Sequence, residues 1–461
     1  MLREKGVSNM SRHIPIAFFV GLALSLLLGA SRCSEKSGSA GGGSVPERTA
    51  AGTPAEDAGS VSDAADAGDV PRSVDDGSAP GTRRLTSMDD RLIQGQSAFA
   101  FRLLRNACGS GKHENLFISP LSVSAALSMA LNGAAGKTAG EMSGVLGVSE
   151  IGLDEVNRSM ADLETALESA DSAVALTVAN SLWLRQGFEL RPDFLRVNTE
   201  FYRAETASLD FSDPGAPAVI NGWVKKSTRG LIDGIVDSIS RETMLYLINA
   251  IYFKGSWQAE FDPSLTSDGA FRLAAGGEKK VPMMNRSGSF RYGEDAALQV
   301  VRLPYGGGRM AMYVFLPRST DGLAGLLDTL DERSLAEWAG KLRSRDGDVS
   351  IPRFKIAYEC ALSPALKAMG MKSAFDAGAA DFSAMSGERL FISEVKHKAV
   401  VDVNEEGTEA AAVTSIEMKA TSVEAPMDRF SFVADRPFFF VIRDDATGAL
   451  LFIGTLYDPA S

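Results

Sequence analysis

The stretch HKAVVDVNEEGTEAAAVTS, residues 397–415, changes character halfway along its length. Residues 401–404 alternate between apolar and polar side chains, and residues 397–403 are rich in valine, which is typical of a strand. After a glycine at position 407, the side chains are mostly small. A segment that packs so weakly directly after a good strand must serve something other than core packing.

The composition of the chain is that of an ordinary globular protein. Its 461 residues are 45% hydrophobic, which is ample for a substantial core, and their formal net charge is -12. A nucleic-acid surface needs a clustered basic face, and the sequence shows none. We therefore expect no nucleic-acid partner.

Cysteine and histidine are both scarce, with three of each. Three cysteines cannot form a disulfide framework, and Cys108 and Cys360 lie in apolar surroundings that favour buried free thiols. His13 lies near the N-terminus, which leaves only His113 and His397 for the rest of the chain. A histidine-dependent catalytic triad or histidine-rich metal site is nearly excluded, and we expect no metal and no cofactor.

The N-terminal residues 1–33 have the pattern of a secretory signal. In MSRHIPIAFFVGLALSLLLGASRCSE, basic residues precede an apolar run over 14–28 that is too short to span a membrane. Translation starts at Met1 or Met10. Cys33 resembles the lipid-modified cysteine of bacterial lipoproteins, although Arg32 departs from the small residue expected there. Cleavage after Ala30 or Ser31 is the alternative, and it would give a soluble exported protein.

Residues 34–88 form a distinct segment rich in Ser, Gly, Ala, Asp and Pro. Such a segment cannot bury enough apolar area to offset its ordering entropy, so we expect a disordered linker. Behind an acylated Cys33, this linker would hold a folded domain away from a membrane. A spacer with no further role is equally compatible with the composition.

The folded part, residues 89–461, begins with helical patterns. Helical spacing starts after Asp89, and a second helix is expected from Ser119-Pro120 to Gly133. Further helices are predicted at 153–169, 192–202, 216–227, 334–342 and 363–369. The Gly-Lys-Thr at 136–138 is not a phosphate-binding loop, because Leu131 replaces its first glycine and a helix precedes it. We expect a helix-terminating loop there.

Strand patterns dominate the middle and the end of the chain. They are ALTVANSLWL, TMLYLINAIYF, FRLAA, LQVVRLPY, MAMYVFLP, VSIPRFKIAYE, VKHKAVVDV, RFSFVADRPFFFVIRD and ALLFIGTLYD. Helices come first and strands later, without regular alternation. This order predicts one large α+β domain with antiparallel or mixed sheets.

Four separated stretches resemble the serpin family over essentially the whole region from residue 89 to 459. NLFISPLSVSAALSMALNGA (115–134) is similar to an early helix of that family, and LINAIYFKGSWQAEFD (247–262) to a central-sheet strand followed by a Lys-Gly-x-Trp turn. HKAVVDVNEEGTEAAA (397–412) resembles the reactive-loop hinge, and FVADRPFFFVIRD (432–444) the C-terminal signature. The resemblance implies a serpin fold, with a large central sheet and an exposed reactive-centre loop near the C-terminus.

The resemblance also gives the small residues a purpose. In serpins a target protease cleaves the reactive-centre loop, and the freed arm inserts into the central sheet as a new strand. Because alternate residues of a strand face one side, Thr408, Ala410, Ala412 and Thr414 should point inward, and all are small. Gly407 supplies a flexible pivot. The implied hinge comprises Glu405, Glu406, Gly407, Thr408, Glu409, Ala410, Ala411, Ala412, Val413 and Thr414.

The resemblance assigns further roles. A polar cluster that latches the sheet where its strands part corresponds to Asn115, Ser119, Pro120, Ser122, Asn249 and His397. Trp257 corresponds to an aromatic side chain at the top of the sheet, where insertion begins. From the residues alone, a satisfied histidine within a strand is the favoured interpretation of His397, and an ordinary core residue is the alternative for Trp257.

The family's usual loop length places the reactive bond between Thr421 and Ser422. The stretch from there to Pro437 is longer than is typical, so Lys419 and Met418 are alternatives. Thr421 would suit an elastase-like or subtilisin-like protease, Lys419 a trypsin-like enzyme and Met418 a chymotrypsin-like one.

We therefore expect an exported bacterial serpin that is a suicide inhibitor of serine proteases, not an enzyme, and that acts as a monomer. Papain-like cysteine proteases are a less favoured target class. A non-inhibitory serpin that binds a ligand or serves as a scaffold is the alternative. The protein would be secreted, or held at the cell envelope through Cys33, which would be its only membrane attachment.

Overall fold

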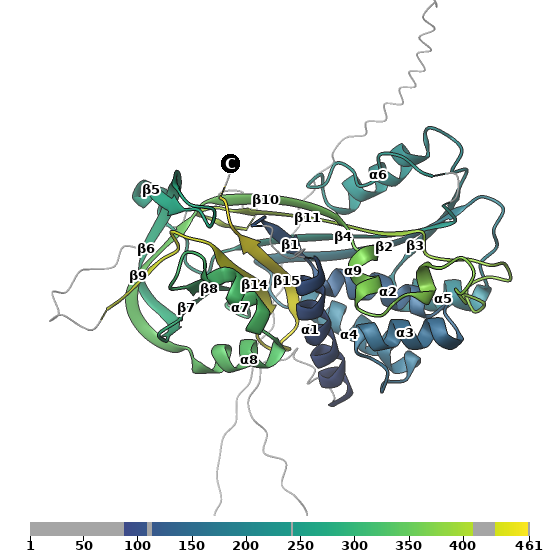
Figure 1. The fold of residues 1–461 in the computed structure, drawn as a ribbon, viewed down its shortest axis with the longest axis horizontal. Helices are drawn as coiled ribbons and strands as arrows, with labels where there is room; N and C mark the ends of the chain where they lie inside the picture. Colours follow the sequence, from purple (N-terminus) through teal and green to yellow (C-terminus); the bar gives the residue numbers. More distant parts are fainter. Residues whose placement is uncertain (1–86, 108–112, 241–242, 409–428, 460–461) are drawn as a thin grey trace, which may run out of the picture. The chain divides into compact units, whose positions relative to one another are not determined.

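A computed structural model describes residues 87–107, 113–240, 243–408 and 429–459 (Figure 1). All of them belong to one unit of the chain, Gly77–Ser461. The predicted signal segment and the linker up to residue 86 lie outside the described ranges. No helix within those ranges is long and apolar enough to cross a membrane.

The described helices include every one that the sequence predicts, with ends that differ by one or two residues. Ser119 caps the second of them, since its side chain accepts a hydrogen bond from the backbone N–H of Ser122, and Pro120 occupies the first helical position. The helices are α1 (Ser87–Ala107), α2 (Pro120–Leu131), α3 (Gly136–Leu146), α4 (Leu153–Glu168), α5 (Pro192–Tyr202), α6 (Ala216–Ser227), α7 (Gly322–Thr329), α8 (Glu332–Lys341) and α9 (Ser363–Ala368).

Two of these helices, α3 and α7, are not predicted by the sequence. The residues expected to form only a loop after α2 instead enter α3 at Gly136. Three glycines in α3 and two in α7 lower the intrinsic helix propensity by about 1 kcal/mol each relative to alanine. Burial of Thr138, Met142 and Leu146 stabilises α3, and such tertiary packing leaves little local signal.

The strands form two sheets. The six-stranded sheet has the order β10 (Phe354–Ala361), β11 (Glu394–Val403), β12 (Gly407–Thr408), β4 (Leu245–Ser256), β2 (Val174–Arg185) and β3 (Glu205–Leu209). The nine-stranded sheet has the order β1 (Leu116–Ile118), β15 (Leu450–Leu456), β14 (Phe438–Asp444), β8 (Met310–Pro317), β7 (Leu298–Pro304), β6 (Glu278–Glu294), β9 (Arg343–Pro352) and β13 (Phe430–Val433), with β5 (Ser267–Arg272) paired to β6. The expected α+β class with antiparallel or mixed sheets is confirmed.

Several strand boundaries differ from the prediction. VSIPRFKIAYE is two strands, because the chain leaves the nine-stranded sheet at the end of β9 and joins the other sheet in β10. RFSFVADRPFFFVIRD likewise divides into β13 and β14. The short β1, the half-exposed β3 and the largely polar β6 have no strong apolar alternation and are not predicted. The expected turn at residues 254–257 begins later, since β4 continues through Ser256.

Both faces of the six-stranded sheet are covered. Tyr246 and Ile248 of β4 pack with Ile220 of α6, whereas Leu245 and Leu247 belong to the core formed with the N-terminal helices. Figure 1 shows α6 on one side of this sheet and α2–α5 on the other. Burial on both faces explains why the sequence of β4 is a nearly continuous apolar run instead of an alternating one.

Candidate functional site

Within the described residues, β4 and β11 pair directly with each other at one end only. At the lower end, Tyr246–Ile248 pair in parallel with Glu394–Lys396. At the upper end, where β4 finishes at Ser256, the short strand β12 lies between them and pairs with both. Between these ends, residues 249–254 pair only with β2 and residues 397–402 only with β10 in the described registers. The sheet therefore has a main-chain interval into which a strand can be added.

A tight turn leads from β11 into β12. Asn404 donates its N–H to the carbonyl of Gly407 at 2.9 Å, and its side-chain Oδ1 accepts from the N–H groups of Glu406 and Gly407. Turns stabilised by an Asn side chain in this way are common where a chain reverses direction. This turn directs Thr408 back between the two strands.

Gly407 has a φ of 155°, a conformation that other residues rarely adopt. A Cβ at this position would lie 2.1 Å from the carbonyl oxygen of Gly255. Close approach to β4 therefore requires glycine here, in addition to the pivot that the sequence predicts. A side chain at 407 would push the start of the arm out of the sheet.

Thr408 is the first predicted inward position and is 2% exposed. It pairs with Val403 of β11 and Gly255 of β4, and its hydroxyl lies 2.7 Å from the hydroxyl of Tyr305. Burial raises the pKa of Tyr305, so the phenol stays protonated and can share this hydrogen bond. The Thr408 side chain therefore points into the protein interior.

Glu405 anchors the turn through its carboxylate. It accepts hydrogen bonds from Arg353 at 3.1 and 2.5 Å and from the Thr266 hydroxyl at 2.6 Å, and it is 4% exposed. Burial by itself would raise the pKa of Glu405, but these hydrogen bonds outweigh it and the pKa is lowered. The carboxylate therefore stays charged and fixed at neutral pH.

Trp257 packs at the upper end, as expected. Its indole stacks on Tyr305 with ring centroids 4.5 Å apart, and its Nε1–H donates to the carbonyl of Asn404 at 2.9 Å. Its backbone N–H donates to the carbonyl of Glu406 at 2.8 Å. Trp257 thus binds the hinge turn directly and is more than a core residue.

A buried polar group lies under the interval between β4 and β11. His397 is 1% exposed, and its Nε2 accepts a hydrogen bond from the backbone N–H of Ser119 at 3.2 Å. The Ser119 hydroxyl donates to the carbonyl of Leu451 at 2.7 Å. Burial lowers the pKa of His397 to about 4, so the imidazole is neutral and its Nε2 can accept.

Asn249 belongs to the same level of the sheet. Its side-chain Nδ2 donates to Oδ1 of Asn180, the residue opposite it on β2, at 2.6 Å. Its own Oδ1 is buried and has no hydrogen-bond partner among the described residues, and the same holds for the hydroxyl oxygen of Ser122. Buried polar atoms of this kind usually find a partner, so these two need an explanation.

Asn115 does not join this group, contrary to the prediction. Its side chain instead accepts from the N–H groups of Tyr457 and Asp458 and donates to the carbonyl of Asp458. Asn115 precedes β1, which pairs with β15, so its neighbours are the residues that follow β15. Asn115 therefore joins the start of β1 to the end of β15 and does not belong to the polar group around His397.

The remaining predicted site residues lie outside the described ranges. These are the hinge from Glu409 to Thr414, the reactive-bond candidates Met418, Lys419, Thr421 and Ser422, and Cys33. Within the described ranges, no group of three His, Cys, Asp or Glu side chains is placed to hold a metal ion.

Sequence reasoning missed several residues that complete the site. Asn180, Thr266, Tyr305, Arg353 and Asn404 each contact a predicted site residue. Only Asn404 carried a local signal, because Asn-Glu-Glu-Gly after a strand is typical of a turn. The others come from distant segments and had no signal of their own.

Lowering the pH from 7 to 5 is expected to destabilise the folded protein by about 2 kcal/mol through His397 alone. The unfolded imidazole titrates near 6.5 and the folded one near 4, so the unfolded chain binds the extra proton between these values. This stability is present above pH 6.5 and is lost as the pH falls toward 4. Urea unfolding at both pH values measures it. The His397→Gln variant should lose this part of the pH dependence of the free energy of unfolding. If the variant keeps the full dependence, groups other than His397 cause it.

Glu405→Gln is expected to lower the free energy of unfolding by about 2 kcal/mol, because charge-assisted hydrogen bonds to a buried carboxylate are lost. The loss is limited because Arg353 is half exposed. Asp402→Asn is the matched control on the neighbouring strand. It breaks an exposed ion pair with Lys355, 3.3 Å long, and should change stability by less than about 0.5 kcal/mol. Equal effects in denaturant unfolding would contradict the anchoring role of Glu405.

Comparisons with known proteins agree with this geometry. Residues 94–459 match the family model Serpin (serine protease inhibitor). The leukocyte elastase inhibitor of Homo sapiens is 35% identical over 386 residues, covering 80% of this chain and all of the relative. An uncharacterised serpin-like protein of Thermococcus kodakarensis is 37% identical over 377 residues, covering 80% of this chain and 86% of that protein.

Solved structures share the fold. The native state of tengpin, a thermophilic serpin, matches with a TM-score of 0.73 and 31% identity over 79% of this chain and 94% of tengpin. Human thyroxine-binding globulin complexed with thyroxine matches with a TM-score of 0.75 and 28% identity over 81% of this chain and all of that protein. The family model covers most of the chain, and its relatives match over nearly their whole length, so this chain belongs to the serpin family.

Proposed function

We propose that this serpin is a suicide inhibitor of serine proteases. The protease attacks a bond of the reactive-centre loop, and the freed arm inserts between β4 and β11 while the protease is still acylated. The inhibitor itself performs no turnover, because the nucleophile belongs to the protease. Insertion of the arm as a strand, which serpins use, supplies the driving force.

The register of β12 is the observation that carries the proposal. Thr408 is opposite Val403 on β11 and Gly255 on β4, both in antiparallel pairing. Continuing both registers by one residue at a time places residues 409–414 against 397–402 and 249–254. These are the same two segments that lack a common partner strand. The register of β12 therefore matches the interval that the arm would fill.

The side chains of the arm fit the two faces of that interval. On β11, His397, Ala399 and Val401 are buried, and the residues between them are partly exposed. Continuing the register would place Ala410 opposite Val401 and Ala412 opposite Ala399, so small residues would enter the tightest face. Glu409 would lie opposite Asp402, on the more exposed face, where a charge is tolerated.

Thr414 would complete the polar group beneath the sheet. The same register places it between His397 and Asn249. The Oδ1 of Asn249 has no partner among the described residues, and a threonine hydroxyl beside it can donate the missing hydrogen bond. Arm insertion would thereby remove a desolvation cost that the uninserted sheet carries.

The energetics are adequate for trapping. Each added ladder hydrogen bond contributes about 1 kcal/mol net, so an arm of about ten residues would contribute on the order of 10 kcal/mol. That is comparable to the entire stability of a typical domain. Insertion on this scale can distort an attached protease.

The target class and the location of the protein extend the proposal. The reactive bond is proposed at Thr421-Ser422, with Lys419 and Met418 as alternatives, which favours an elastase-like or subtilisin-like protease. Resemblance to a leukocyte elastase inhibitor supports a protease target. We further propose a bacterial, exported monomer that is secreted or anchored through Cys33. Its signal pattern supports export.

Ligand binding without inhibition is the second candidate, because thyroxine-binding globulin has the same fold and is named for binding a small molecule. The small side chain at Thr408 favours inhibition, since a non-inhibitory serpin has no need for an arm that fits the sheet. The next two experiments distinguish these candidates.

The full-length protein should form a detergent-resistant covalent complex with at least one of trypsin, chymotrypsin, elastase and subtilisin. Gel electrophoresis detects the complex, and the mass of the released C-terminal peptide identifies the cleaved bond among Met418, Lys419 and Thr421. An active-site serine-to-alanine protease is the control and should form none. Clean cleavage with neither a complex nor a gain in thermal stability would leave a fold used for binding.

Thr408→Arg should abolish the complex but leave cleavage of the loop intact. An arginine at this 2% exposed position would bury an unpaired charge, which costs several kcal/mol. Glu409→Arg is the matched control, because it adds the same side chain one residue later on the face that carries Asp402. The ratio of complex to cleaved inhibitor measures both effects. Retention of the complex by Thr408→Arg would rule out insertion in this register.

A further inference from the structure

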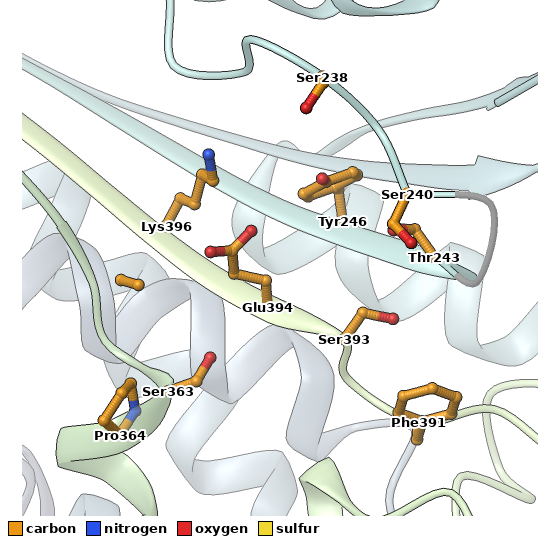
Figure 2. A pocket seen from close by; sticks show the side chains of 11 residues that line it. Ser238, Ser240, Thr243, Tyr246, Ser363, Pro364, Phe391, Ser393, Glu394 and Lys396 are labelled. Atoms are coloured by element: carbon orange, nitrogen blue, oxygen red, sulfur yellow. The ribbon is translucent and has the colours of Figure 1, made fainter.

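A cavity of about 590 Å³ lies at the lower end of the six-stranded sheet. Tyr246 contributes from β4 and Lys396 from β11, and Ser363 begins α9 (Figure 2). The segment between α6 and β4 forms the opposite wall with Ser238 and Ser240. Cavities that bind small molecules have volumes of roughly 300–1,000 Å³, so this one has the size of a ligand site.

The lining of the cavity is rich in hydroxyl groups. Ser393 also lines the cavity, but its hydroxyl oxygen is buried in the wall and has no hydrogen-bond partner among the described residues. A hydroxyl both donates and accepts, so a hydroxyl-rich lining matches a ligand that is itself rich in hydroxyls. Six of the eleven lining side chains carry one: Ser238, Ser240, Thr243, Tyr246, Ser363 and Ser393.

The charges in the cavity balance each other. Among its described lining residues, only Glu394 and Lys396 are charged, and as alternate residues of a strand the two lie on the same face of β11. Lys396 Nζ also reaches the carbonyl of Ile235 at 3.4 Å. One cation and one anion together favour a neutral ligand over an ion, because an ionic ligand would meet a like charge. The rings of Tyr246 and Phe391 add apolar faces to the lining.

We propose that this cavity binds a neutral polyhydroxylated molecule of the size of a mono- or disaccharide. Hydroxyl groups of the lining would hydrogen-bond to the sugar hydroxyls. The aromatic rings would contact the C–H face of the sugar ring.

The cavity is built on the strands that arm insertion must separate, and this part of the inference rests on the proposed function. Tyr246 is opposite Glu394 in the parallel pairing at the lower end, and both line the cavity. Continuing the register of β12 would place residues 415–417 between Tyr246–Ile248 and Glu394–Lys396. Insertion beyond Thr414 would break that pairing and move the walls of the cavity apart. A bound sugar would therefore favour the uninserted sheet and slow insertion.

Binding is tested on the intact full-length protein, without any protease. Titration calorimetry with glucose, galactose, maltose and cellobiose is the primary measurement, with glucuronate and glucosamine as charged comparisons. We expect saturable binding of at least one neutral sugar at one site, and a rise in the thermal midpoint with sugar concentration. Absence of binding by every neutral sugar, or binding of only a charged one, would overturn the assignment.

Two variants locate the binding site. Ser238→Trp fills the cavity from an exposed position and should weaken sugar affinity by at least about tenfold. Asp237→Trp is the matched control, since Asp237 is exposed, adjacent and outside the lining. Equal affinities in the two variants would place the sugar elsewhere. Unchanged thermal midpoints without sugar show that both variants fold.

A separate experiment measures whether sugar binding affects protease inhibition. With saturating sugar, the wild type should form less covalent complex and more cleaved inhibitor, whereas Ser238→Trp should show no change on adding sugar. Sugar binding with an unchanged ratio would overturn the coupling. If no protease is trapped with or without sugar, the proposed function fails, and the calorimetric result still decides the binding site.

Discussion

The unfilled main-chain interval between β4 and β11 is the constraint on which the rest of this structure depends. Residues 249–254 and 397–402 each have one partner strand, so their other edges are open to a new strand. Covering elements bury both faces of the sheet, so an added strand must thread between them in one register with small inward side chains. The interval therefore has the form that the proposed insertion of the arm requires.

Both ends of the interval are held closed by polar contacts. At the upper end, the ion pair of Glu405 with Arg353 fixes the hinge turn. Trp257 donates two hydrogen bonds to the same turn, one from its backbone N–H and one from its indole N–H. At the lower end of the interval, neutral His397 joins β11 to Ser119 at the start of α2. Each of these contacts contributes only modestly to the free energy of unfolding. The proposed insertion needs such contacts, because the sheet must be closed before cleavage and open afterwards.

The lower end gives the sheet a second point of control. The same strand pairing that forms a wall of the hydroxyl-rich cavity would have to break before the arm is fully inserted. A ligand bound there as proposed would have different affinities for the two states, and differential affinity is what a regulator needs. The cavity, the interval and the hinge all lie along β4 and β11. A change in the spacing of these two strands at the cavity would therefore act directly on the interval.

The sequence by itself determined the α+β class, most helices, and the alternation that turns Thr408 inward, because these follow from local periodicity and side-chain size. The sequence could not reveal α3, because its glycines lower the local helix propensity and tertiary packing stabilises the helix. It also could not give the correct neighbours of Asn115. Arg353, Thr266 and Tyr305 likewise had no local signal, since each acts on a hinge residue far away in the chain. Only the tertiary structure decided these partners and the common register of β12 with β4 and β11, because strand register is set by contacts between segments that are distant in sequence.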